Sequence, residues 1–140
     1  MSDIKHLLVI NAPPEKVYRA LTEQEGLTGW WTHQAVIKPE AGSIAEFRFG
    51  DRYHNQMKIT ELIPNLRVRW RCDLGEKEWI NTVFVFDLEK DGQKTILRFT
   101  HGDWRRETDF FAFCNYQWGR YMNSLKLYCE TGQGEPFTGS

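Results

Sequence analysis

Residues 108–131 read TDFFAFCNYQWGRYMNSLKLYCET, and this stretch decides the fold. Its apolar side chains recur three or four positions apart, which is the period of an amphipathic α-helix; they are Phe111, Cys114, Trp118, Tyr121, Leu125 and Tyr128. We expect the helix to begin near Thr108 and to end at Thr131, because Gly132 can adopt the left-handed conformation that often follows a helix. A helix with so wide an apolar stripe needs a partner surface.

The sequence before this helix predicts an antiparallel sheet. β-branched and aromatic residues dominate a series of short segments separated by turn residues, at 44–49, 56–63, 67–72, 82–88 and 95–101. We also expect a first strand at residues 5–11, a short helix at 14–22, a second short helix or turn at 25–32, and an extended segment at 35–37. Because the later segments are joined by connections of hairpin length, neighbouring strands should run antiparallel, and the fold class is α+β.

Alternation of apolar and polar residues assigns a buried face to this sheet. The side chains expected on that face are Phe47, Phe49, Met57, Ile59, Val68, Trp70, Cys72, Phe84, Phe86, Leu97, Phe99 and His101. Arg67, Arg69 and Arg71 fall on the opposite face, where glutamates are interspersed with them. We interpret that face as solvated, in preference to an anion-binding or RNA-binding surface.

The length and composition of the chain indicate one globular domain. Its 140 residues suffice for a hydrophobic core, and we expect a single domain over residues 1–140 with an ordered core from about residue 3 to residue 132. The 18 basic and 19 acidic residues leave a net charge of −1, so nothing in the charge favours nucleic acid, and no segment is apolar for long enough to cross a membrane. The first residues lack the features of a secretion or transit signal, and we therefore expect a cytoplasmic location.

Short phrases near both ends of the chain carry a family resemblance. INAPPEKVYRAL at residues 10–21 is followed by GWWT at residues 29–32, and near the other end Cys114-Asn115 precedes Trp118, Ser124-Leu125-Lys126 and then ETGQGEPF at residues 130–137. These phrases resemble the family called activator-of-Hsp90-ATPase-homologue-1-like. The order of the elements looks like the helix-grip fold of the START-like (SRPBCC) superfamily.

The resemblance implies a curved antiparallel sheet wrapped around a long C-terminal helix, with two short helices after the first strand. Members of the superfamily enclose a cavity between sheet and helix, and they range from lipid and hormone binders to cyclases and co-chaperone domains. One departure is visible after the last strand, where the family often has His-x-Gly-Trp and this chain has His101-Gly102-Asp103-Trp104. The shifted glycine leaves the geometry of this turn and the role of Asp103 open.

The aromatic residues indicate what such a cavity would hold. The six tryptophans either fill the core or leave a gap between rigid rings. We expect a small apolar or aromatic molecule to bind between the sheet and the helix, with His101 and Asn115 orienting any polar group that it carries. The expected wall residues are Trp31, Phe49, Met57, Trp70, Phe84, Phe99 and Trp118.

Signs of catalysis are weak. His101 can be a general base assisted by Asp103, a ligand partner, or a satisfied buried imidazole, and these alternatives stay open. The cysteines Cys72, Cys114 and Cys129 lack both C-x-x-C spacing and basic neighbours, so we expect buried thiols. No serine lies in a nucleophile elbow and no glycine-rich phosphate loop is present, and we therefore expect neither a metal nor a cofactor.

Three hypotheses for the function follow. The favoured one is a binding module without enzymatic activity. The second is an enzyme of the cyclase or dehydratase type that acts through His101. The third is an interaction domain for a chaperone, for which the face of Arg67, Arg69 and Arg71 is the candidate surface. The sequence leaves the oligomeric state open between monomer and homodimer.

Overall fold

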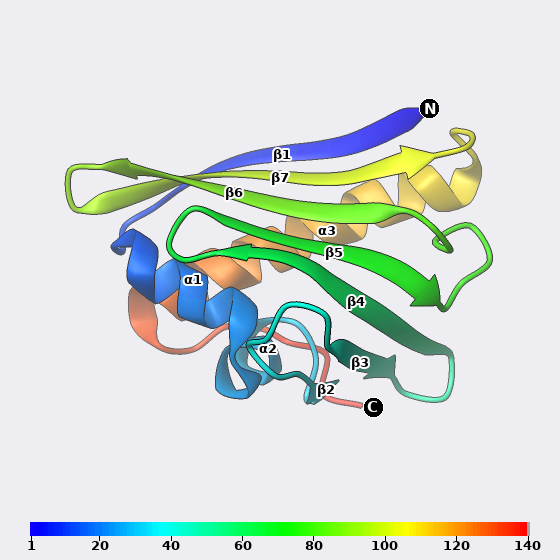
Figure 1. Cartoon of the computed structure of the whole chain (residues 1–140), viewed down its shortest axis with the longest axis horizontal. Coiled ribbons are helices and arrows are strands. Elements are labelled where there is room, and N and C mark those ends of the chain that lie inside the picture. The colour runs from blue at the N-terminus through cyan, green and yellow to red at the C-terminus, as the bar shows by residue number, and fades with distance from the viewer. Residues whose placement is uncertain (140) are drawn as a thin grey trace.

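A computed structural model describes residues 1–139, and Ser140, the last residue of the expected domain, lies outside them. This part of the chain forms one sheet and three helices (Figure 1). The strands are β1 (Ser2–Ile10), β2 (Gln34–Val36), β3 (Ile44–Phe49), β4 (Tyr53–Ile63), β5 (Arg67–Leu74), β6 (Val83–Asp91) and β7 (Lys94–Trp104). The helices are α1 (Pro14–Thr22), α2 (Gln24–Trp30) and α3 (Asp109–Thr131).

The strands form a single antiparallel sheet in the order β1-β7-β6-β5-β4-β3-β2. Strands β2 to β7 follow one another as a meander, and β1 pairs with the last strand, so that Ile4 lies opposite His101 and Ile10 opposite Thr95. The two short helices connect β1 at one edge of the sheet to β2 at the other edge. The expected α+β fold with a hairpin-connected antiparallel sheet is confirmed.

Helix α3 runs across one face of the curved sheet, behind the strands in Figure 1. Its predicted limits are confirmed: the Thr108 side chain accepts a hydrogen bond from the Phe111 N–H at 3.3 Å, and Gly132 ends the helix with φ of +88°. The side chains predicted on the inner face of the sheet are buried, except Phe49, which is half-buried. The sheet and the helix therefore enclose a common core.

The strands extend beyond their apolar segments because backbone pairing continues through polar residues. Strand β4 begins at Tyr53 instead of the expected residue 56, since Tyr53 pairs with Phe49 and Asn55 pairs with Phe47. As a result Asn55 occupies an inward position of the sheet, where its side chain is 2% exposed. This polar residue on the inner face was absent from the sequence-based prediction.

The end of β7 explains the altered family phrase. Asp103 has φ of +66°, a left-handed conformation that glycine adopts more readily, and the pairing of β1 with β7 is irregular between Ser2 and Ile4. The backbone N–H of Asp103 donates to Oδ1 of Asp3 at 3.1 Å. Asp103 therefore occupies an irregular position of the strand pair that a glycine would suit.

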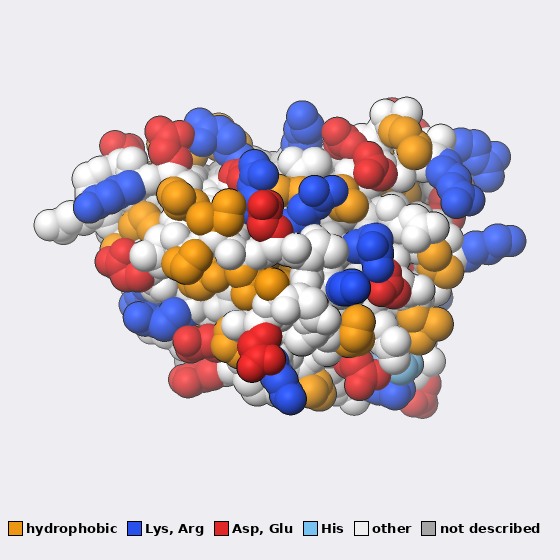
Figure 2. Space-filling view, in the orientation of Figure 1, with side chains coloured by type: hydrophobic (Ala, Val, Ile, Leu, Met, Phe, Trp, Pro, Cys, Tyr) orange, Lys and Arg blue, Asp and Glu red, His pale blue; other side chains and the backbone are white. Residues whose placement is uncertain are grey.

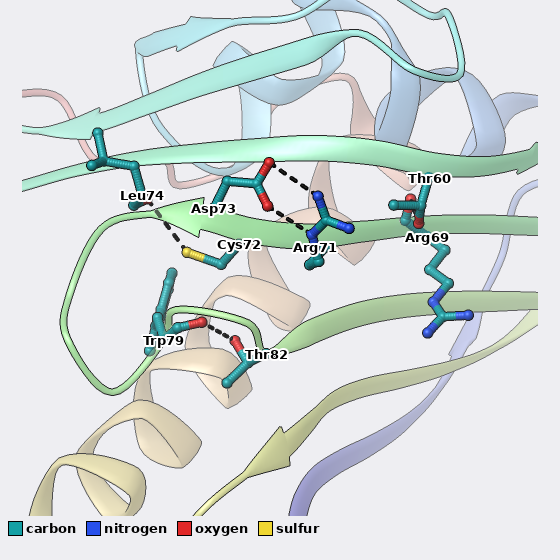
Figure 3. Close-up of polar contacts among 8 residues, drawn as sticks. All are labelled: Thr60, Arg69, Arg71, Cys72, Asp73, Leu74, Trp79 and Thr82. Carbon is teal, nitrogen blue, oxygen red and sulfur yellow. Dashed lines mark hydrogen bonds and ion pairs between the residues drawn. The ribbon is translucent and has the colours of Figure 1, made fainter.

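The outer face of the sheet carries charges of both signs, as Figure 2 shows. Arg67 Nε lies 2.7 Å from Oδ1 of Asp87, and Arg71 Nε lies 2.7 Å from Oδ1 of Asp73. Arg69 projects away from the Arg71–Asp73 pair (Figure 3) and forms no ion pair within residues 1–139. Two of the three arginines thus have carboxylate partners on their own sheet, which fits the interpretation of a solvated face.

The C-terminal segment fastens α3 to α2. The hydroxyl of Ser124 donates to the carbonyl oxygen of Trp30 and accepts from the backbone N–H of Glu135, both at 2.7 Å. Two residues further along, the Phe137 N–H donates to the Trp31 carbonyl at 2.9 Å. We call these contacts the Ser124 clasp. One buried hydroxyl therefore joins α3, the last residue of α2 and the chain beyond Gly132.

Replacing Ser124 by Ala should destabilise the protein. The change leaves the buried Trp30 carbonyl and the Glu135 N–H without their partner, and unsatisfied groups of this kind cost about 1–3 kcal/mol. Urea unfolding followed by tryptophan fluorescence measures the loss. Ser43→Ala is the matched control, because the Ser43 hydroxyl bonds only to nearby backbone in an exposed turn. Equal stability of the two variants would contradict the role of the clasp.

Candidate functional site

A cavity of about 80 Å³ lies between the inner face of the sheet and the first half of α3. On the sheet side its lining comes from the end of α2, from β3 and β4, and from the connection between β5 and β6: Trp31, Phe49, Tyr53, Asn55, Glu76 and Trp79. On the helix side the lining consists of Phe110, Phe113, Cys114, Gln117, Trp118 and Tyr121. Most of these side chains are aromatic, so the walls are large, stiff and apolar.

The structure places only part of the expected wall at this cavity. Trp31, Phe49 and Trp118 line it, as their positions in the sequence indicated. The other four expected wall residues lie outside this lining and are at most 1% exposed: Met57, Trp70, Phe84 and Phe99. Their side chains fill the space between sheet and helix.

Close ring packing explains why this part of the interior holds no cavity. The ring centroids of Phe99 and Trp118 are 4.5 Å apart, and those of Phe86 lie 4.9 Å from Phe99 and 5.0 Å from Trp70. Such contacts are typical of interlocking aromatic side chains. The cavity therefore lies at the end of the interior where the connection between β5 and β6 meets α3.

Asn115 was expected to orient a ligand, and the structure corrects this. Its side chain is exposed, and its Oδ1 pairs with Nε2 of His6 on β1 at 3.0 Å. The residue lies one position after Cys114, which faces the cavity, and a step of one residue rotates a helical side chain by about 100°. That rotation carries the Asn115 amide to the β1 side of the helix.

His101 is a fully buried imidazole with both nitrogens satisfied. The indole N–H of Trp118 donates to His101 Nδ1 at 3.0 Å, which makes Nδ1 an acceptor and places the ring proton on Nε2. Nε2 then donates to the Thr82 hydroxyl at 2.8 Å, and that hydroxyl donates to the Trp79 carbonyl at 2.6 Å (Figure 3 shows this last bond). Burial lowers the pKa of His101 well below its ordinary value of 6.5. The residue is held neutral, and it does not line the cavity.

Asp103 does not assist His101. Its side chain is exposed at the irregular end of β7, and among residues 1–139 no hydrogen bond joins it to the imidazole. The acid–base pair considered from the sequence is therefore not assembled. Of the three alternatives for His101, the satisfied buried imidazole is the one that the geometry supports.

Asn55 lines the cavity, and its amide oxygen lies against Gly75. Its Oδ1 atom is buried and has no hydrogen-bond partner in the described part of the chain. The amide lies against Gly75, where an added Cβ would come within 2.3 Å of Oδ1, and Gly75 has φ of +155°. A glycine at this position therefore leaves the room in which the Asn55 amide sits. The alternation of apolar and polar residues in β4 could have revealed Asn55 only if the strand had been predicted to begin before residue 56.

Trp79 contributes a second polar atom whose hydrogen bonding is weak. Its buried indole N–H finds no nitrogen or oxygen acceptor among the described residues and faces the thiol of Cys114, a poor acceptor. Trp79 lies in the connection that sequence reasoning treated as a turn. This connection is longer than a hairpin needs, and it contains two residues with positive φ, Gly75 and Asn81. These two features were the available signal that it does more than join two strands.

The lining is almost wholly apolar, and Glu76 is the acidic residue among those that form it. Glu76 is half-buried, and its carboxylate makes no ion pair within residues 1–139, whereas no Lys, Arg or His lines the cavity. Burial raises the pKa of the Cys114 thiol to about 12, an effect that the Trp79 N–H opposes and that the charges of Glu78 and Glu76 increase. The thiol is therefore protonated, and Glu76 is the charged group of the site.

The three cysteines lack the surroundings of reactive thiols. Cys72, Cys114 and Cys129 are free and buried, as expected, and burial raises the pKa of each thiol to about 12. Within residues 1–139, no group of three or more His, Cys, Asp or Glu side chains is arranged to hold a metal ion. None of the helices in the described range is both long and apolar enough to span a lipid bilayer.

Residues 11–130 match the sequence profile of the Activator of Hsp90 ATPase homolog 1-like protein family. The chain belongs to this family. The Aha1 dimer from Colwellia psychrerythraea, solved in solution, is 40% identical, covers 96% of this chain and 100% of its own, and superposes with a TM-score of 0.87. No curated protein matches the chain.

More distant structures share the helix-grip fold of this Activator of Hsp90 ATPase homolog 1-like family member. DynU16, a protein of the dynemicin biosynthetic locus, is 19% identical with a TM-score of 0.83 over 96% of this chain and 49% of its own. CalU16 from Micromonospora echinospora is 17% identical with a TM-score of 0.72 over 90% of this chain and 73% of its own. At such identities the likeness shows the fold alone.

The phrases that carried the family resemblance lie mainly at the Ser124 clasp. A Cβ at Gly29 would come within 2.3 Å of the Tyr128 ring, and a Cβ at Gly134 would come within 2.9 Å of the carbonyl oxygens of Gly29 and Ser124. Both glycines are therefore needed where the two ends of the family pattern meet. Most of these motif residues build the scaffold, and the cavity is lined largely by residues outside them.

Replacing His101 by Gln should change the pH dependence of stability. Because the folded protein disfavours the imidazolium, the contribution of His101 is fully present above pH 6.5 and is lost as the pH falls below it, by about 1.4 kcal/mol per pH unit. Glutamine does not titrate in this range. The difference in unfolding free energy between wild type and His101→Gln should therefore narrow by about 1.4 kcal/mol for each pH unit below 6.5.

Urea unfolding of both proteins at several pH values between about 5 and 7 gives this difference, in which the effects of shared carboxylates cancel. A difference that is constant over this range would contradict a neutral His101. Long-range ¹⁵N NMR of the imidazole provides an independent check, since it should report a protonated Nε2 and an unprotonated Nδ1.

Proposed function

We propose that the chain binds a small apolar or aromatic molecule in the cavity between the sheet and α3. The observation that carries the proposal is a cavity with aromatic walls, beside which Asn55 holds a buried amide oxygen without a hydrogen-bond partner in the described residues. A core that serves stability alone fills such spaces and pairs such atoms. Ligand sites, by contrast, combine apolar walls with a few polar groups that fix orientation.

The size of the cavity limits how much of a ligand it encloses. Its 80 Å³ is about half of the roughly 150 Å³ that accepts benzene in an engineered protein core. The enclosed part of the ligand is therefore a few heavy atoms, and the remainder extends toward Phe113, which is 49% exposed at the rim. A larger polar groove of about 560 Å³, between α3 and residues 135–138, shares Gln117 and Tyr121 with the cavity and adjoins it.

The hypothesis of a cyclase or dehydratase lacks a catalytic group at this cavity. His101 is enclosed and neutral, Asp103 is exposed elsewhere, and the Cys114 thiol is protonated. Glu76 is the one carboxylic acid among the described lining residues, whereas acid–base chemistry usually needs a positioned pair. We therefore propose binding and not turnover, in the cytoplasm, where three free buried thiols are compatible with a reducing environment.

We also propose that the chain forms a homodimer. The support is the relative from Colwellia psychrerythraea, which is described as a dimer and is 40% identical over its full length. Sedimentation velocity should give a mass of about twice the 16.6 kDa of one chain. A mass of one chain at every concentration tested would contradict this.

The chaperone hypothesis rests on the family description alone. Two of the three arginines proposed as its docking surface have carboxylate partners within the sheet, so the structure adds no support for that surface.

Binding in the cavity predicts that filling it abolishes binding. The neutral probe 2-phenylethanol should shift the backbone amide NMR signals of residues around Trp79 and Cys114 in the wild-type protein. Cys114→Met places a longer apolar side chain in the cavity and should weaken binding by at least about tenfold, or about 1.4 kcal/mol. Ala112→Met is the matched control, because Ala112 is exposed on the same helix.

A second variant separates loss of binding from loss of folding. Phe113→Ala removes a half-exposed ring at the rim, which costs little stability, and should weaken binding several-fold through lost apolar contact. The proposal fails if 2-phenylethanol binds Cys114→Met as tightly as it binds wild type, or if its signal changes do not cluster at the cavity.

A further inference from the structure

We infer that the two chains of the homodimer meet through the exposed side of α3, with the two copies of this helix packed antiparallel. This inference rests on the proposed homodimer and names its interface. It starts from four residues that are all exposed on α3: Asp109, Phe113, Tyr116 and Arg120. Their spacing of four, three and four positions places them in one row along the helix, and we call them the α3 row.

The middle of the α3 row is apolar. Phe113 is 49% exposed and Tyr116 is 64% exposed, and within residues 1–139 they are the only exposed large hydrophobic side chains on a helix. Aromatic residues are enriched in protein interfaces, where they bring a large and rigid contact area. The exposed side of α3 therefore carries an apolar centre for a contact.

The ends of the α3 row carry opposite charges. Asp109 is the first residue of α3, and Arg120 follows about three helical turns later. Neither side chain forms an ion pair within residues 1–139. A partner that presents the same row in the reverse order therefore matches the charge at both ends.

A second copy of this chain is such a partner. When a two-fold axis crosses α3 between Phe113 and Tyr116, the two helices run antiparallel, and Phe113 of each copy meets Tyr116 of the other. The same axis places Asp109 opposite Arg120 of the other copy, and it does so twice. A parallel pair in register would instead bring equal charges together at both ends. The order of the charges in the α3 row thus selects the antiparallel homodimer.

This contact reaches the rim of the cavity. Phe113 lines the cavity and also belongs to the α3 row. In the antiparallel pair, Tyr116 of the other copy covers the exposed side of the Phe113 ring. Each copy therefore contributes an aromatic side chain to the rim of the other copy's cavity.

The edge of the sheet at β1 is the competing surface for a second copy. Leu7 on this edge strand is 67% exposed. The end of the strand is already covered, however, because Lys126 Nζ donates to the Val9 carbonyl at 2.6 Å and Glu130 accepts from the Asn11 N–H at 2.7 Å. These contacts occupy backbone groups that a second β1 would need for pairing, so the edge is less suited to a dimer than the α3 row.

Charge reversal at the two ends of the α3 row tests the pairing. Asp109→Lys and Arg120→Glu should each raise the dimer dissociation constant at least tenfold, since each change turns two attractive contacts into repulsive ones. The double variant Asp109→Lys/Arg120→Glu restores opposite charges and should return to within threefold of wild type. Sedimentation equilibrium gives the constants, and circular dichroism checks that each variant is folded.

Arg69→Glu is the matched control for the change in net charge. Arg69 is exposed on the outer face of the sheet, has no ion pair within residues 1–139, and lies outside the α3 row. This variant should dimerise as wild type does. A dimer that both single reversals leave unchanged, or one that the folded double variant does not recover, overturns the inference and leaves the homodimer standing. A monomeric wild type overturns both.

A second comparison separates the α3 row from the edge of the sheet. Tyr116→Ala removes a mostly exposed ring from the centre of the row and should weaken the dimer at least tenfold, whereas Leu7→Ala removes an equally exposed side chain from β1 and should leave the dimer intact. Dissociation of the Leu7→Ala dimer together with an unchanged Tyr116→Ala dimer overturns the inference, because it places the contact at the strand edge.

Discussion

The packing of the Trp118 side chain against the inner face of the sheet is the contact on which the rest of the structure depends. Its ring lies 4.5 Å from Phe99 and 5.3 Å from Trp31, measured between centroids, and its N–H is fixed by His101. The residue thus joins α3 to β7 and to the segment after α2. Because an indole is large and its single donor has one acceptor here, the contact sets both the distance and the rotation of the helix relative to the sheet.

This contact also determines where the cavity can be. The interior around Trp118 is filled by interlocking rings. A chain of hydrogen bonds runs from Trp118 through His101 and Thr82 to the Trp79 carbonyl, and it holds the Trp79 backbone in place. The cavity lies beyond Trp118, beside the Trp79 ring and the first turns of α3. The buried polar series is therefore a positioning device for one wall of the cavity, and its histidine needs no role in chemistry.

The sequence predicted the scaffold well because the scaffold follows local rules. The helix of residues 108–131 and the inner face of the sheet are periodic, and a cap and a glycine mark the ends of the helix. The cavity was predicted less well because it depends on how rings from separate elements fit together. Trp70 and Phe84 have the same pattern and composition as true wall residues, and only the three-dimensional packing shows that they fill space. Asn55 was missed because backbone pairing extends β4 through polar residues that carry no strand signal.

Asn55 differs from the other unpaired polar atoms of the interior. The indole N–H groups of Trp70 and Trp104 also lack acceptors among the described residues, but both rings have aromatic neighbours, Phe86 at 5.0 Å and Phe111 at 5.1 Å. An N–H can lie against the negative face of a ring at small cost. A carbonyl oxygen cannot, because it meets that face with charge of the same sign. The Asn55 oxygen lies against Gly75, and no hydrogen bond within residues 1–139 reaches it. The buried oxygen of Asn55 therefore lowers stability, since an unpaired polar group of this kind costs about 1–3 kcal/mol.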